Sequence, residues 1–448
     1  MNQEFMKEKK ILPLVISMSL PMVISMAVNS LYNIVDSYFV ASISEDAMTA
    51  LSLVYPIQSL MTAIAVGFGV GINAKIAFCL GANDKKTANQ AASTGLLLSI
   101  IHGIILMVVC LAAMPWFLSL YIEDNQAILD MALAYANRAF LFSVIIMAGI
   151  CIEKVFQAVG RMKETMVCML VGFVANIVLD PLLIFGIGPF PEWGIAGAAY
   201  ATGIGQTLTL LAYIIFMIVK PIPVSFSRKN LAFPKELMSS LYLVGVPATL
   251  NMALPSVLIS SLNGIAAVFS DKYILVLGAY FKLQTFIYLS ASGVIQGIRP
   301  IVSYNYGAGE EKRVQSVFRT SLGINAIVMA VGMALSMFIP GQLIGIFTSS
   351  QETIAIGVQA LRIISIGFIF SAVSVTCCGV LEALGRGMPS LVVSLLRYVV
   401  VIIPAAFALS RISGVGATGV FVAFPVTEIV TCVASYFIYR KYYKLCFK

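Results

Sequence analysis

Residues 11–40 read ILPLVISMSLPMVISMAVNSLYNIVDSYFV, an apolar run with a single charged residue, Asp36. An α-helix needs about 20 apolar residues to cross the hydrocarbon core of a bilayer, so this run is long enough to span it. A carboxylate at such depth costs at least about 2.5 kcal/mol on insertion scales, and it normally faces a wet cavity or a partner. Asp180 lies in the same way between the apolar segments 167–179 and 181–185. The two aspartates therefore indicate an ion or substrate pathway.

Apolar runs of this kind make up most of the chain. Hydrophobic residues are 60% and charged residues 11% of the 448 residues, far outside the composition of soluble domains. Such long runs fit helices and not barrel strands. We therefore predict an all-α integral membrane protein with twelve transmembrane helices, at about residues 11–40, 46–79, 87–113, 127–159, 164–187, 194–219, 235–268, 271–303, 313–339, 351–384, 388–409 and 415–440.

The positive charges predict the orientation in the membrane. If the N-terminus is cytoplasmic, most of the 28 Lys and Arg residues fall in inside loops and tails, and only Lys272 and Arg411 fall in outside loops. This asymmetry is the positive-inside pattern, and it places both termini in the cytoplasm of a multi-pass protein. We expect a bacterial or archaeal cytoplasmic membrane. The net charge of +8 is explained without a nucleic-acid partner.

The cysteines and the single histidine do not predict a metal site or a cofactor. Seven of the eight cysteines lie in apolar helices, and none shows Cys-x-x-Cys or Cys/His spacing. His102 lies in the third apolar run beside Gly103, where a packed structural role is favoured over a proton relay. We expect no cofactor other than a coupling ion.

The chain contains two copies of one unit. Pro21, Met26, Ala27 and Ser30 recur in register at Pro247, Met252, Ala253 and Ser256. Further matches in the same order pair Gly67 and Gly71 with Gly293 and Gly297, and residues 158–161 with 383–386. Each copy carries six helices, so the repeat is parallel. We predict two six-helix lobes around a central cleft, at residues 1–220 and 236–448, with 221–235 as a cytosolic linker.

Several elements together resemble the MATE (multidrug and toxic compound extrusion) family of secondary transporters, across nearly the whole chain. The elements are Ser19-Leu20-Pro21 leading to Asp36, Asn176-x-x-x-Asp180-Pro181, residues 197–202 and the run from Gly297 to Gly309. The DinF-like branch, and its bacterial multidrug-efflux members in particular, is the most similar. The other, NorM-like branch carries carboxylates in helices 7 and 10. Here residues 247–255 of helix 7 contain no acid, and the interior of helix 10 has none until Glu382, near its cytosolic end.

The resemblance implies a cation-coupling cluster in the first lobe, at Asp36, Asn176, Asp180 and Thr202, and a hinge at Pro21. Asn176 and Asp180 are four residues apart and so share a helix face. Two carboxyl groups close together and away from water titrate as a coupled pair. Asn176 and Thr202 can bond the carboxylates or complete an oxygen shell for Na⁺, so the coupling ion is H⁺ or Na⁺. An interhelical polar clamp without transport is the competing interpretation.

Other polar residues within the apolar runs are assigned to ion pairs or to the substrate cavity. Glu153 and Glu428 are candidate partners for the basic residues nearby, among them Lys154 and Arg397. The candidate substrate cavity residues are Asn33, Tyr200, Tyr280, Lys282 and Gln284.

These features predict an ion-coupled antiporter, most simply a monomer, that exports small amphipathic and often cationic compounds. The alternative is a flippase for a lipid-linked saccharide or another lipid-like substrate, which should have a cavity dominated by Arg and Lys. A channel is disfavoured because no helix carries a repeated polar stripe. An enzyme is disfavoured because no nucleophile–base set is present in the sequence.

Overall fold

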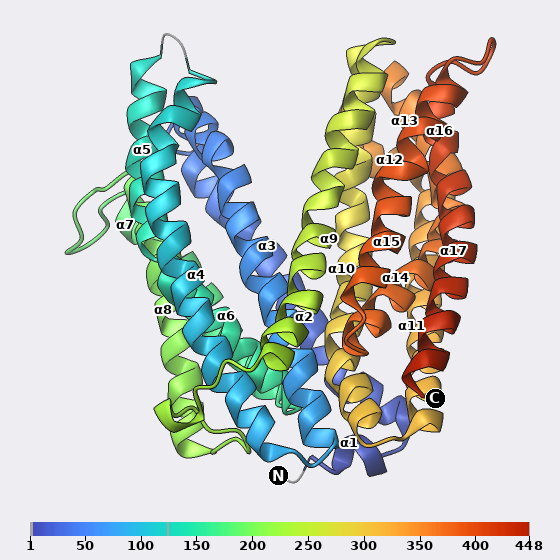
Figure 1. Ribbon diagram of the computed structural model, residues 1–448. Helices are drawn as coiled ribbons and strands as arrows, with labels where there is room; N and C mark the ends of the chain where they lie inside the picture. Colours follow the sequence, from blue (N-terminus) through green and yellow to red (C-terminus); the bar gives the residue numbers. More distant parts are fainter. Residues whose placement is uncertain (1–2, 123–124, 448) are drawn as a thin grey trace. The chain divides into compact units, whose positions relative to one another are not determined.

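The computed structural model describes residues 3–122 and 125–447, and these residues form helices and no strands (Figure 1). Within these described ranges, ten helices are long and apolar enough to cross a membrane, and two bent helix pairs also qualify. The total is twelve spans when each pair counts as one. The predicted all-α membrane architecture is therefore confirmed.

The helices follow the predicted apolar runs, and polar residues cap several of them. Ser44 accepts a hydrogen bond from the Ala47 N–H at 3.0 Å, and Asp84 accepts one from the Thr87 N–H at 3.0 Å. The helices of the first half are α1 (Phe5–Glu8), α2 (Ile11–Ala41), α3 (Glu45–Gly81), α4 (Lys85–Ser119), α5 (Gln126–Leu141), α6 (Ser143–Ala158), α7 (Met162–Ile184), α8 (Ile195–Val219) and the 3₁₀ turn η1 (Arg228–Asn230). Those of the second half are α9 (Lys235–Ala267), α10 (Asp271–Gly307), α11 (Glu311–Phe338), α12 (Pro340–Gly345), α13 (Gln351–Ser365), α14 (Phe368–Ala383), α15 (Gly387–Leu395), the π-helix η2 (Leu396–Val400), α16 (Ile402–Ser410) and α17 (Thr418–Cys446).

Two of the predicted spans are broken in the middle. The run 127–159 divides into α5 and α6 with a bend of 47°, and the run 351–384 divides into α13 and α14 with a bend of 52°. Each break has a serine whose hydroxyl donates to a carbonyl three residues earlier, Ser143 to Phe140 at 2.6 Å and Ser365 to Arg362 at 3.3 Å. Such bonds compete with the regular helical ladder, so they favour a bend.

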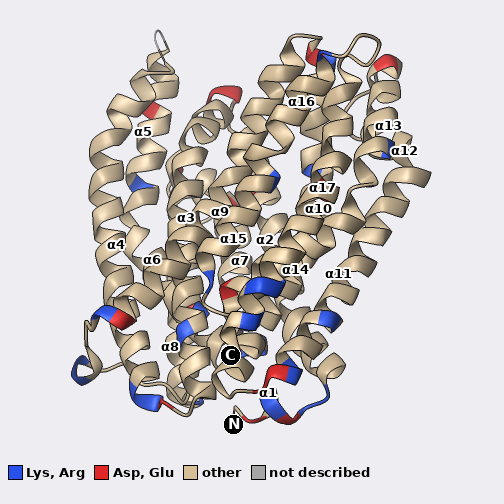
Figure 2. Cartoon of the chain, turned by 45° about the vertical axis from the view of Figure 1, so that its right-hand side comes forward, with Lys and Arg blue, Asp and Glu red and all other residues tan. Residues whose placement is uncertain are grey.

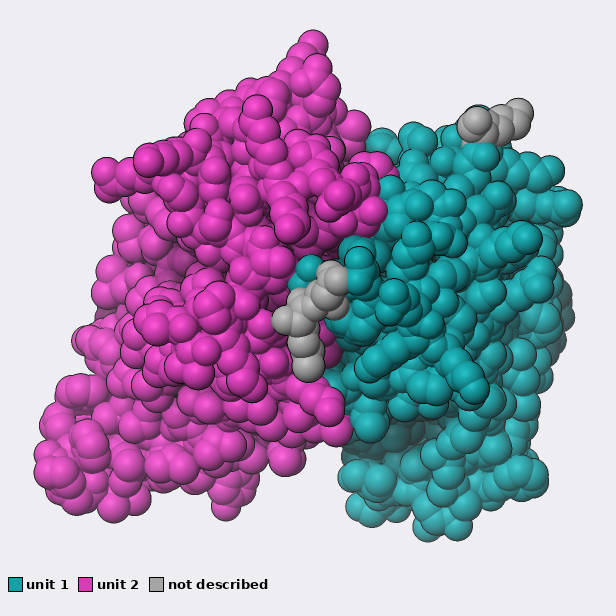
Figure 3. Space-filling model, turned by 90° about the horizontal axis from the view of Figure 1, so that it is seen from below, with its two compact units in different colours: residues 1–23, 246–448 teal, residues 24–245 magenta. Residues whose placement is uncertain are grey.

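The chain divides into two compact units, which Figure 3 colours separately. Unit 1 contains residues 1–23 and 246–448, and unit 2 contains residues 24–245. The start of α2 belongs to unit 1, whereas the start of α9 belongs to unit 2. Each of these two helices therefore changes unit along its length.

Glycines at matching positions of the repeat allow the first parts of α2 and α9 to pack closely against other helices. In unit 2, a Cβ atom on Gly71 of α3 would lie 2.3 Å from the carbonyl oxygen of Leu241, in the first part of α9. In unit 1, a Cβ atom on Gly297 of α10 would lie 2.5 Å from the Cα of Ser19, in the first part of α2. Only a residue without Cβ permits such a close approach of two helix backbones. The matching glycines of the repeat therefore make the same kind of helix contact.

Basic residues gather at one end of the helices of each unit (Figure 2). In unit 1 this is the end where α1 lies. There, Lys7 pairs with Glu310 at 2.9 Å, and Asn305 and Arg313 donate to the carbonyl oxygen of Met6. The segment before α2 is thus fixed to the ends of α10 and α11.

Candidate functional site

The second half of α2 carries Asp36 into the interior of unit 2. Asp36 is 9% exposed, although Ile34 and Tyr38 beside it are exposed. One helical turn earlier, the Tyr32 ring stacks on Phe173 of α7, with 5.3 Å between the ring centres and 9° between the ring planes. The carboxylate of Asp36 and the Tyr32 ring therefore lie on the buried side of the helix, as the charge pattern of the sequence requires.

Asn176 connects Asp180 on α7 to Thr202 on α8. Asn176 and Asp180 are both buried and lie one turn apart. In the amide orientation that satisfies both ends of Asn176, its nitrogen donates to Asp180 Oδ2 at 3.0 Å. Its oxygen then accepts from the Thr202 N–H at 2.9 Å and from the Thr202 hydroxyl at 3.2 Å. Three of the four residues predicted for the cation cluster thus form one hydrogen-bonded group.

The fourth residue, Asp36, lies near this group. Asp36 and Asp180 are close enough for their charges to interact, and Tyr32 and Tyr135 interact electrostatically with both. Tyr135 lies on α5, and its hydroxyl is 3.2 Å from Nε2 of Gln58 on α3. The structure thus brings together the four predicted residues and adds aromatic and amide neighbours that the sequence analysis did not identify.

Both aspartates retain an unused acceptor. Asp36 Oδ1 and Asp180 Oδ1 are buried and have no hydrogen-bond partner among the described residues. A buried carboxylate oxygen without a partner is costly, and a bound proton or metal cation removes that cost. The pair is therefore suited to hold a proton or a monovalent cation. The oxygens of Asn176 and Thr202 are suited to serve as neutral ligands beside it.

Two of the predicted cavity residues lie in unit 2 and make local contacts. Asn33 is exposed, and its side-chain nitrogen donates to the carbonyl oxygen of Asn29 at 2.7 Å. The Tyr200 ring packs against Trp193, with 5.0 Å between ring centres, and lies 5.9 Å from the guanidinium carbon of Arg138. The contacts of Tyr200 are thus with an aromatic and a basic side chain.

The other predicted cavity residues lie in unit 1, and α10 holds them in different surroundings. Tyr280 is 1% exposed and packs among Phe281, Phe368 and Phe424 in the core of that unit. Lys282 is exposed, with its nitrogen 5.7 Å from the centre of the Phe347 ring. Gln284 is half-buried.

The predicted hinge residue, Pro21, lies within an uninterrupted helix. α2 runs from Ile11 to Ala41 through Pro21. Pro21 lies two residues before the point where the chain passes from unit 1 to unit 2. A proline at this position lacks the N–H that would bond the carbonyl four residues earlier. The backbone hydrogen-bond ladder of α2 therefore lacks a donor two residues before the chain passes from unit 1 to unit 2.

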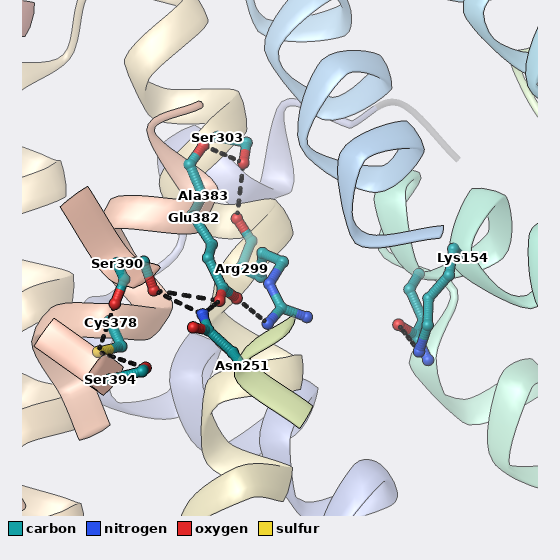
Figure 4. Close-up of polar contacts among 10 residues, drawn as sticks. Lys154, Asn251, Arg299, Ser303, Cys378, Glu382, Ala383, Ser390 and Ser394 are labelled. Carbon is teal, nitrogen blue, oxygen red and sulfur yellow. Dashed lines mark hydrogen bonds and ion pairs between the residues drawn. The ribbon is translucent and has the colours of Figure 1, made fainter. Parts of the chain in front are cut away.

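Unit 1 contains a buried ion pair that the sequence analysis did not predict. Glu382 of α14 accepts from Arg299 at 2.8 Å, from Asn251 at 3.0 Å and from Ser390 at 3.2 Å (Figure 4). Its carboxylate is fully engaged by these three donors. The pair could not be predicted from the sequence, because Arg299 and Glu382 are far apart in the chain and come together only through the packing of α10 on α14.

The equivalent positions in unit 2 are neutral. In the register of the repeat, Arg299 and Glu382 correspond to Asn73 and Gln157. Asn73 donates to the carbonyl oxygen of Lys154 at 3.0 Å, and Gln157 donates to Glu153 at 2.8 Å. Lys154 pairs with Glu153 at 2.7 Å, which confirms the local ion pair expected from the sequence.

The fold and this site define a multi-pass helical membrane transporter with a buried acidic pair. The chain belongs to the MatE family, whose model matches residues 21–182 and 247–407, once in each copy of the repeat. It is 26% identical over 435 residues to the multidrug export protein MepA of Staphylococcus haemolyticus, covering 97% of this chain and 94% of that protein.

Solved structures share the fold. A transporter of the MOP superfamily from Pyrococcus furiosus superposes with a TM-score of 0.92 and 22% identity, covering 100% of this chain and 99% of that chain. A MATE structure in the bent conformation gives the same TM-score and identity, covering 100% of this chain and 98% of that chain. These structures confirm the fold, and the match of the family model confirms the sequence-based assignment to the MATE family.

Proposed function

We propose that the protein is an ion-coupled antiporter that exports small amphipathic, often cationic, compounds. The observation that carries the proposal is the Asp36–Asp180 pair, which is buried within transmembrane helices and has two oxygens without a partner in the described part of the chain. The similarity of the chain to MepA, a multidrug export protein, supports the proposed substrate class. The coupling ion in this proposal is H⁺ or Na⁺.

The proposed location is the cytoplasmic membrane of a bacterium or archaeon, with both termini in the cytoplasm. The concentration of Lys and Arg at the α1 end of unit 1, and at one end of unit 2, supports this orientation. The compound would then be taken up from the cytoplasm or the inner leaflet and released outside.

In the proposed mechanism, the protein alternates between two states. In one state it holds the drug; in the other it binds an ion at the aspartate pair and α2 is bent. An ion that enters from outside neutralises one charge of the pair, and α2 bends near Pro21, where a backbone hydrogen bond is missing. Coupling requires that the two conformations bind the ion with different affinity. A hundred-fold difference supplies about 2.8 kcal/mol of bias. A solved relative in a bent conformation supports the idea that this fold admits bending.

The proposal is tested by dye efflux from proteoliposomes, with a proton gradient and a sodium gradient applied separately. The unaltered protein should drive efflux with at least one gradient, and Asp36→Asn or Asp180→Asn should abolish it. Asp130→Asn is the matched control, because Asp130 is an exposed acid of the same unit that, among the described residues, accepts only from Gln126. Normal efflux by both site variants would exclude the pair as the coupling site, and gradient-independent lipid movement would favour the flippase alternative.

A further inference from the structure

A second buried charge cluster, in unit 1, has no part in the proposed coupling. Arg397 and Glu428 are 6% and 8% exposed. Arg397 lies in the π-helix η2, where the Val401 N–H bonds to the carbonyl of Leu396, five residues earlier, at 3.0 Å. π-helical turns are rare and often mark functional positions. Both the charge and the backbone are therefore unusual at this place.

The guanidinium of Arg397 is held as a bound organic cation would be. Its Nε and Nη2 atoms donate to Glu428 Oε1 at 2.9 and 2.7 Å. Nη2 also donates to the Tyr288 hydroxyl at 2.6 Å, and Nη1 donates to the Tyr398 hydroxyl at 3.3 Å. The guanidinium carbon lies 5.2 Å from the centre of each tyrosine ring. A carboxylate beside aromatic rings is a common arrangement for recognising organic cations.

Glu428 keeps unused binding capacity. Because two N–H groups of Arg397 share Oε1, the other oxygen, Oε2, is buried without a hydrogen-bond partner among the described residues. A planar cation with two parallel N–H groups would engage both oxygens of a carboxylate. Gly367, at the break between α13 and α14, allows the backbone of the break to lie close to the Glu428 side chain. A Cβ atom at Gly367 would lie 3.1 Å from Glu428 Cγ.

Stability alone does not account for this cluster. A buried ion pair is weak evidence for stabilisation, since well-packed apolar residues of similar volume often replace one without loss. The other buried Arg–Glu pair of the same unit provides a comparison. Glu382 receives hydrogen bonds from Asn251 and Ser390 in addition to Arg299, so its carboxylate would stay partnered without the arginine. Glu428 has no such second set of donors among the residues that the structure describes.

We propose that Glu428, Tyr288 and Tyr398 form a second ligand site of the exporter, for planar organic cations of the guanidinium and amidinium class. Arg397 is the tethered occupant that such a compound displaces. This inference rests on the proposed function, because it takes an exported cation as the ligand. It concerns a different unit from the aspartate pair and is tested separately.

The first test measures binding of benzamidine, an amidinium, and of tetraphenylphosphonium, which has no N–H group, to the purified full-length protein. Removal of a tethered competitor frees the site, so Arg397→Ala should bind benzamidine at least about ten-fold more tightly, with little change for tetraphenylphosphonium. Glu428→Gln in the Arg397→Ala background should remove this gain. Arg299→Ala is the matched control and should show none.

The second test measures transport. In proteoliposomes, Glu428→Gln should lower benzamidine efflux at least about five-fold relative to tetraphenylphosphonium efflux, because only the amidinium loses its paired acceptor. Glu382→Gln should leave this ratio unchanged. If the unaltered protein moves neither compound, the proposed function fails while the binding test still decides the inference.

The inference is wrong if Arg397→Ala gives no gain in benzamidine affinity, or if Arg299→Ala gives the same gain. It is also wrong if Glu428→Gln changes the transport of both compounds equally. Should Arg397→Ala not fold, Arg397→Lys keeps the charge but lacks the forked N–H groups, and it should give a smaller gain of about three-fold. The absence of any gain in that variant would equally contradict the proposal.

Discussion

The four buried carboxylates among the described residues differ in their partners. Glu382 and Glu428 in unit 1 each pair with an arginine, at 2.8 and 2.7 Å. Asp36 and Asp180 in unit 2 form no ion pair with Lys or Arg among the described residues. A buried carboxylate that has no fixed partner in the protein favours the binding of a mobile cation. This difference is the reason to assign ion coupling to unit 2.

Asn176 provides the residue-scale prediction. A hydrogen bond to a charged group contributes about 1.5–3 kcal/mol, so Asn176→Ala should lower gradient-driven efflux by about ten-fold or more. The measurement is the initial rate of dye efflux from proteoliposomes. Thr207→Ala is the control, since its hydroxyl donates to the Gly203 carbonyl within α8 and to no other described residue. Equal rates for the two variants would show that the link between Asp180 and Thr202 has no role in coupling.

The sequence identified the acidic residues of the site but not its aromatic ones. Asp36 and Asp180 stand out because a charge in an apolar run is costly, and Asn176 follows from helical spacing. Tyr32 and Tyr135 carry no such signal, because tyrosines are ordinary in apolar helices. Their place beside the aspartates depends on how α2, α5 and α7 pack, which local sequence does not determine. Gln58, a polar residue in a long apolar helix, was the sequence signal that could have indicated a further residue near the site.

At the scale of helices, Pro21 provides a test of the bending step. Pro21→Ala restores the missing N–H, so α2 should bend less easily. Drug efflux should slow by about five-fold or more, while the dissociation constant of the drug changes by less than about two-fold, as expected when only a conformational step is affected. Transport rate and equilibrium binding are measured on the same preparation.

The control for Pro21 is Pro56→Ala, which changes a proline within α3 of unit 2. It should leave the efflux rate close to that of the unaltered protein. If Pro21→Ala also transports at the normal rate, bending at this residue is not part of the cycle.

The cap of α4 provides a prediction on pH. Hydrogen bonds from the Thr87 side chain and backbone hold the pKa of Asp84 below its ordinary value of 3.8. Because the folded-state pKa is lowered, the stabilisation is present above the ordinary pKa and is lost as the pH falls through the folded-state pKa. Asp84→Ala should therefore cost about 1 kcal/mol at pH 7, and the cost should shrink as the pH falls from 5 toward 3.

This prediction is checked by the thermal midpoint of unfolding in detergent at several pH values. Asp84→Asn is the control, since asparagine caps a helix as well as aspartate without a charge. A gap between Asp84→Ala and the unaltered protein that stays constant with pH would contradict the role of the ionised cap.

Helix number was predictable from the sequence, whereas the breaks in two helices were not. Length and apolar content determine whether a run can span a membrane. The breaks near Phe142 and Gly367 depend on single serine side chains and on close packing, such as the Phe142 ring against Gly203. Ser143 and Ser365 also fit an unbroken helix, so the apolar pattern continues across both bends.

At the scale of the whole chain, the repeat explains how each unit is completed. The first part of α2 belongs to unit 1, and the first part of α9 belongs to unit 2. These two segments occupy matching positions in the repeat, and each packs on a matching glycine, Gly297 or Gly71. The matched residues were visible in the sequence. The exchange of helix starts between units was not, because it concerns which surface a helix covers.

The glycines provide a prediction at this scale. Gly71→Ala and Gly297→Ala each place a methyl group against backbone atoms, at 2.3 and 2.5 Å, so each should destabilise the protein by about 1–3 kcal/mol. Gly264→Ala is the control, because a Cβ atom there meets nothing within 4 Å. It should be neutral or stabilise by about 0.5–1 kcal/mol through better helix propensity.

The measurement is the thermal midpoint of unfolding of the three variants in detergent. A midpoint for Gly71→Ala or Gly297→Ala at or above that of Gly264→Ala would show that these helix starts do not pack as described.

The central claim is that drug and ion compete through the Asp36–Asp180 pair. It is tested most directly by adding a cationic drug to purified protein in weakly buffered detergent and recording proton release with an indicator and sodium release with an electrode. The unaltered protein and Asp130→Asn should release one of the two ions on drug binding. Asp36→Asn and Asp180→Asn should still bind the drug, but they should release no proton or sodium ion, or much less than the unaltered protein. Drug binding that releases as much ion from both site variants as from the unaltered protein would contradict the account.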